Sequence, residues 1–174
     1  MEQNVDYEPP AGRSDASFSP CPVDRMPRRS RNKLCVAIIA VGALNFVVYT
    51  IVYAALGGDA HNGEIRLVEQ LDGSKAPAYY VRGHFIRSLA GQEAQVTRRV
   101  WIYSYLHSMS MFVTSAAMIV SMLVLARPHI LATMRDDWIS GRTFVTVFGT
   151  IVVLVTSGAI FIFAWDFIAQ LGLE

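Results

Sequence analysis

The sequence predicts an all-α membrane protein with three transmembrane helices and a small β-hairpin in the extracytoplasmic loop. The 174-residue chain is 53% hydrophobic and only 17% charged, where soluble domains carry about a quarter charged residues. Acidic and basic residues are absent from three runs, 34–58, 100–126 and 143–165. Each run exceeds the ~20 residues that cross a bilayer as a helix. Three such runs in so short a chain leave too few residues for a polar shell, so we expect lipid around them.

Residues 1–33 predict a disordered, basic cytoplasmic tail, because they are polar and rich in Pro, Ser and Arg. The basic residues directly before the first span are Arg25, Arg28, Arg29, Arg31 and Lys33. Such a cluster is retained in the cytoplasm. A cleaved signal peptide is the alternative, but its apolar core would span only ~7–15 residues. We therefore expect a multi-pass protein of the cell (inner) membrane with a cytoplasmic N-terminus and an extracytoplasmic C-terminus, 166–174.

The charges beside the second span, Arg98 and Arg99, argue for the opposite orientation. The first helix usually dominates, so we keep the cytoplasmic N-terminus. Aromatic rings favour the membrane interface, and the residues expected near the outer one are Tyr53, Trp101, Tyr103, Tyr105 and Trp165.

The extracytoplasmic loop, 59–99, is the place for a folded element outside the membrane. Its segment 64–70 alternates polar and apolar residues, and 78–87 is rich in β-formers. An Asp-Gly pair and a proline separate them, so the pattern predicts a hairpin over about 64–87. An isolated hairpin is marginal in water, and we expect it to pack on the membrane face, on a partner or on a helix at about 89–99. The cytoplasmic loop, 127–142, carries apolar residues at helical spacing and predicts a short interfacial helix.

Each predicted span carries a narrow face of small and polar residues, which lets helices approach closely and form hydrogen bonds. At ~1.5 Å per residue, the polar faces of the three spans meet roughly 6–12 Å below the outer interface. The predicted helix-packing layer consists of Asn45, Tyr49, Tyr53, Tyr103, His107, Ser110, Thr114 and Ser157. His107 is the ionisable residue of the second span, and the layer would supply its hydrogen-bond partners.

An alternative is a cofactor-binding role for His107, because ionisable residues within spans are functional candidates. A metal site needs several ligands, and Asp59, His61 and His84 lie on the same predicted side of the membrane. Their spacing fits no ligand motif. A haem between spans usually takes two membrane histidines, so a second copy or a partner would have to complete it.

The sequence contains no P-loop, GxGxxG, nucleophile elbow or zinc-protease motif. Its basic residues form no face with interleaved aromatics, so we expect no nucleic-acid partner. The leading hypothesis is a non-enzymatic accessory or scaffold protein without a cofactor, packing with itself (a homo-oligomer) or with a larger membrane complex. The alternatives are a metal- or haem-binding oxidoreductase component using His107 with His61 or His84, and an oligomeric transport component, since three helices enclose no pore.

Four short segments carry a resemblance: "GGDAHNGE" (57–64), the pair Tyr79–Tyr80, "GHF" (83–85) and "VWIYSYLHS" (100–108). In these, over about residues 57–110, the chain resembles small uncharacterised bacterial inner-membrane proteins. In that group a GDAxNG-like turn follows the first helix and a YSxxH segment opens the next. The resemblance implies a location in the inner membrane and no particular activity.

Overall fold

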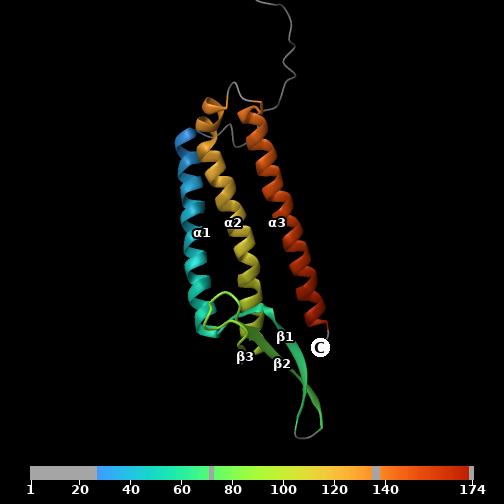
Figure 1. Ribbon diagram of the computed structural model, residues 1–174. Coiled ribbons are helices and arrows are strands. Elements are labelled where there is room, and N and C mark those ends of the chain that lie inside the picture. Colours follow the sequence, from blue (N-terminus) through green and yellow to red (C-terminus); the bar gives the residue numbers. More distant parts are fainter. Residues whose placement is uncertain (1–26, 71–72, 135–137, 173–174) are drawn as a thin grey trace, which may run out of the picture.

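The protein folds into three long helices with a three-stranded antiparallel sheet at one end (Figure 1). The computed structural model describes residues 27–70, 73–134 and 138–172. The elements in chain order are α1 (Arg28–Leu56), β1 (Asp59–Glu69), β2 (Lys75–Arg82), β3 (Glu93–Val96), α2 (Arg98–Thr133) and α3 (Gly141–Leu171). All three helices are long and apolar enough to cross a membrane, which confirms the prediction of three candidate spans.

The helices lie side by side, and α2, in the middle, packs against both α1 and α3 (Figure 1). They contain 29, 36 and 31 residues, about 43, 54 and 46 Å at the α-helical rise. Each is longer than the ~30 Å hydrocarbon layer. The helices therefore extend beyond the uncharged runs: α1 begins within the predicted tail, and α2 continues through Pro128 to Thr133. Most of the predicted tail, 1–26, lies outside the described residues.

A glycine turn connects α1 to the sheet. Gly57 ends α1 in the left-handed conformation, with φ 80°, which glycine adopts without steric cost. The amide of the next residue, Gly58, donates to the carbonyl of Tyr53 at 3.0 Å. A side chain at Gly58 would collide with the backbone of Arg82. This close approach brings Asp59, the first residue of β1, directly against the end of α1.

The predicted hairpin is the β1–β2 pair, in which Ile65 lies opposite Tyr79. The end of β1 and the beginning of β2 lie away from the helices (Figure 1). The helix predicted at about 89–99 was wrong: residues 93–96 form β3, which pairs with β2 over Tyr79–Arg82. The alternation of exposed and half-buried residues along β3 places Ala94 and Val96 against the core. A helix begins only after Thr97, so tertiary pairing decided the structure of this segment.

The buried core lies where the sheet meets the ends of α2 and α3. Its members are Ala60, Tyr79, Val81, Trp101 and Tyr105, with Phe167 and Leu171 of α3 packed against them. Trp101 and Tyr105, which the sequence predicts near the membrane interface, are both 0% exposed. Their rings contact the sheet or α3, and the Trp101 ring stacks on that of Phe167 with centroids 6.1 Å apart. Tyr103 and Trp165 are exposed and remain available to a lipid interface.

Candidate functional site

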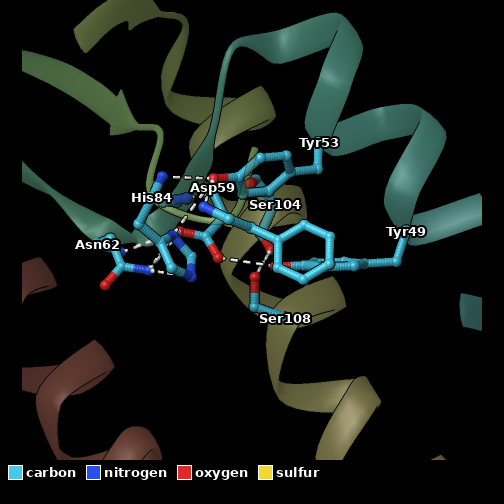
Figure 2. A network of polar contacts seen from close by, with 9 residues as sticks. Tyr49, Tyr53, Asp59, Asn62, His84, Ser104 and Ser108 are labelled. Atoms are coloured by element: carbon cyan, nitrogen blue, oxygen red, sulfur yellow. Dashed lines mark hydrogen bonds and ion pairs between the residues drawn. The ribbon is translucent and has the colours of Figure 1, made fainter. Parts of the chain in front are cut away.

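The most connected group of polar side chains surrounds Asp59, where α1, α2 and the sheet meet (Figure 2). We call Tyr49, Tyr53, Asp59, Asn62, His84 and Ser104 the Asp59 cluster. The Asp59 carboxylate is only 3% exposed. It accepts hydrogen bonds from the Tyr49 hydroxyl at 2.8 Å and from the backbone and side-chain nitrogens of Asn62 at 3.2 and 2.9 Å. A carboxylate can be buried at modest cost when donors of this kind replace its water.

Tyr53 holds the segment that follows β2. Its ring is 1% exposed, and its hydroxyl oxygen accepts from the backbone N–H groups of His84 and Phe85 at 2.5 and 2.6 Å. The His84 ring turns towards the cluster: its Nδ1 lies 2.9 Å from the Asn62 amide nitrogen and 3.9 Å from an Asp59 oxygen. The His84 side chain is 51% exposed, so water reaches this member of the cluster.

Helix α2 contributes serines to the same junction (Figure 2). The hydroxyl of Ser104 accepts from the backbone N–H of Ala60 at 3.1 Å, and the hydroxyl of Ser108 donates to the carbonyl of Ser104 at 3.0 Å. Both serines are buried. The first residues of β1 are thus bonded to α1 through Tyr49 and to α2 through Ser104.

A second polar group lies deeper between α1 and α2, around Asn45. The Asn45 carbonyl oxygen lies 3.2 Å from Nε2 of His107, and its amide nitrogen lies 3.2 Å from both Ser110 and Thr114. The Tyr49 ring meets the His107 ring edge-on at 5.5 Å. Since the hydroxyl of Tyr49 also bonds to Asp59, this tyrosine joins the two groups.

The predicted polar layer is therefore divided in the structure. Tyr103 contacts His107, with ring centroids 5.5 Å apart, and belongs with the Asn45 group. Tyr53 contacts His84, nearer the sheet. Ser157 is exposed on α3.

Helix α3 is held by contacts that the sequence did not predict. The Tyr105 hydroxyl donates to the Asp166 carboxylate at 2.7 Å, and Gln170 donates to the same oxygen at 2.8 Å. The ring of His61 packs between Tyr105 and Phe163, at centroid distances of 5.6 and 4.2 Å. The sequence did contain one signal: Asp59 and Asp166 are each the first charged residue after an apolar run, where a carboxylate needs a partner.

The candidate metal ligands Asp59, His61 and His84 and the candidate cofactor ligand His107 occupy three places. Asp59 and His84 lie together, His61 lies towards α3, and His107 faces α1. Within the described ranges, no three His, Cys, Asp or Glu side chains lie close enough together to hold a metal ion. The short contacts of Asp59 are to the hydrogen-bond donors Tyr49 and Asn62. The bond to Tyr49 joins the start of β1 to α1.

Comparison with protein-family models, curated proteins and solved structures finds no match for this chain. The functional argument therefore rests on the geometry of its own residues.

Proposed function

We propose that this chain is a non-catalytic membrane protein, an accessory or scaffold component that packs with itself or with a larger membrane complex. In this proposal the three helices span the cell membrane, the N-terminus is cytoplasmic, and the sheet is on the outer side. The hydrogen bonds of the Asp59 cluster and the Asn45 group hold the sheet and α1 against α2.

The exposed face of α3 is the observation that carries this proposal. Its small and polar residues Thr146, Thr150, Ser157 and Gly158 are exposed, although sequence patterns of this kind are typical of helix–helix contacts. A methyl group added at Gly158 would meet nothing within 4 Å. The Thr146 hydroxyl donates to the carbonyl of Arg142 within α3 at 3.0 Å. To the hydroxyls of Thr150 and Ser157, lipid offers no hydrogen-bond partner, whereas another helix does. An additional helix packed there would satisfy these groups.

The Asp59 cluster and the Asn45 group support the same role. Polar groups in lipid must be satisfied within the protein, and the bonds of Asn45 and Asp59 do this while joining α1, α2 and the sheet. Residues in such a layer specify helix position, because apolar packing in lipid has little hydrophobic driving force. A rigid outer element on a membrane anchor is suited to positioning a partner.

The test is purification of the full chain in mild detergent, with particle mass and co-purifying proteins measured together. A cysteine-free background then receives Ser157→Cys or, as the matched control, Val155→Cys, on a different side of α3 and also exposed. We expect a particle larger than one chain, and cross-linking at position 157 but not at 155. A monomer that recovers no partner and forms no cross-link at 157 would refute the proposal.

A metal- or haem-binding role is the second candidate, because imidazole nitrogens are free to act as ligands. The Nδ1 atoms of His107 and His61 are both buried and have no hydrogen-bond partner among the described residues. If His107 donates from Nε2 to Asn45, its Nδ1 carries a lone pair. The same preparation, from cells grown with ample iron, copper and zinc, should then be coloured or contain stoichiometric metal. A colourless, metal-free protein would end this hypothesis.

A further inference from the structure

A basic cavity lies between the beginning of α1 and the last turns of α2. These helix ends are at the end of the molecule away from the sheet (Figure 1). Its volume of about 500 Å³ falls within the ~300–1,000 Å³ of small-molecule sites. The lining residues are Arg28, Arg31, Asn32, Val124, Leu125, Arg127, Pro128 and Leu131. None of these lining residues is acidic.

Three arginines from two helices line the cavity. Arg28 and Arg31 are three residues apart on α1 and so share one face of that helix, and Arg127 is on α2. Guanidinium groups bind phosphate oxygens in pairs through their planar fork of N–H donors. The amide of Asn32 adds a further donor and acceptor. The polar part of the lining therefore has the chemistry of an anion site, and a phosphate group fits it.

The remaining lining residues are apolar: Val124, Leu125, Pro128 and Leu131. Pro128 has no N–H to donate to the carbonyl of Val124, so one backbone hydrogen bond of α2 is missing here. The cavity lies at this point of the helix. A soluble phosphate would use only the arginine side of such a lining, whereas a lipid presents a phosphate and an apolar body together.

We propose that this cavity binds the phosphate headgroup of an anionic phospholipid, with its glycerol and upper acyl chains against Val124, Leu125 and Leu131. The position of the cavity supports a lipid as the source of the phosphate. Lipid headgroups lie at the ends of membrane-spanning helices, and basic pockets between helices attract anionic headgroups. The inference is independent of the scaffold proposal, because it concerns the opposite end of the molecule.

The test uses the full chain, delipidated in mild detergent. Binding of phosphatidylglycerol, phosphatidylcholine and inorganic phosphate is measured by native mass spectrometry and microscale thermophoresis. We expect phosphatidylglycerol to bind in preference to both. Arg28→Gln, Arg31→Gln and Arg127→Gln should each weaken its binding about fivefold. The control is Arg142→Gln, which removes an exposed arginine near the start of α3 that does not line the cavity, and it should leave the affinity unchanged.

A variant with all three cavity arginines changed to lysine distinguishes loss of binding from loss of folding. It keeps the positive charge and removes only the planar fork of N–H donors. It should retain selectivity for phosphatidylglycerol with reduced affinity. Equal binding of phosphatidylcholine, or an equal loss of affinity in Arg142→Gln, would overturn the proposal. Tight binding of inorganic phosphate that competes with the lipid would overturn the lipid source and assign the cavity to a free phosphate.

Discussion

Replacement of Asn45 by leucine tests the fastening of α1 to α2. The Asn45 amide has two hydrogens for its acceptors on α2, and its oxygen accepts from His107, so at most three interhelical bonds form at once. Hydrogen bonds between membrane helices average about 0.6 kcal/mol, which gives a loss of about 2 kcal/mol. Leucine has the same branching and number of side-chain heavy atoms as asparagine, so that the shape of the side chain is similar and its polar atoms are removed. We expect the folded-to-unfolded ratio to fall about 30-fold.

The assay is reversible unfolding of the full chain in mixed micelles by increasing dodecyl sulfate, followed by circular dichroism. Thr50→Val is the matched control, because among the described residues the Thr50 hydroxyl bonds only to the carbonyl of Phe46, within α1, at 2.9 Å. Combining Asn45→Leu with His107→Phe should show a coupling of about 0.6 kcal/mol for the bond between the two side chains. Equal stability of Asn45→Leu and wild type, or an equal loss in Thr50→Val, would refute this account of the α1–α2 contact.

Three further substitutions probe the sheet end. Tyr53→Phe removes the acceptor for two backbone amides, so hydrogen exchange at His84 and Phe85 should accelerate about tenfold, whereas Tyr103→Phe should not change it. Tyr105→Phe leaves Asp166 with Gln170 alone and should destabilise the docking of α3 by about 1–3 kcal/mol, read from the thermal midpoint. Gly63→Ala places a methyl group on the carbonyl of Tyr80 and should expose the hairpin to limited proteolysis. Gly91→Ala, in open space with φ 80°, should cost only about 1–2 kcal/mol. Unchanged proteolysis of Gly63→Ala would contradict the β1–β2 register.

The candidate spans were predictable because they depend on local composition. A run without charges such as 34–58 is long enough to be read directly from the sequence. The hairpin was predictable for a similar reason, because alternation and turn residues are local signals. β3 was not, because four residues carry little propensity and their structure follows from pairing with β2.

The candidate site was only partly predictable. The partners of Asn45 follow from helical spacing on two faces that pack together. Asp59 was considered as a metal ligand, and its bond to Tyr49 depends on the left-handed turn at Gly57 that carries the chain back over α1. Burial of Trp101 beneath the sheet likewise follows from the chain path and not from residue type.

The polar contacts identify what sets the positions of these helices relative to one another. In lipid, apolar side chains pack equally well against acyl chains or a neighbouring helix, so they specify position weakly. Each neighbour of α2 is instead fixed by a polar contact: α1 by Asn45, the sheet by Ser104, and α3 by Asp166. A slide of one residue displaces a helix by about 1.5 Å, enough to break the 2.7 Å bond between Tyr105 and Asp166. These few polar residues therefore determine how α1, the sheet and α3 are aligned along α2, because the apolar surfaces do not determine it.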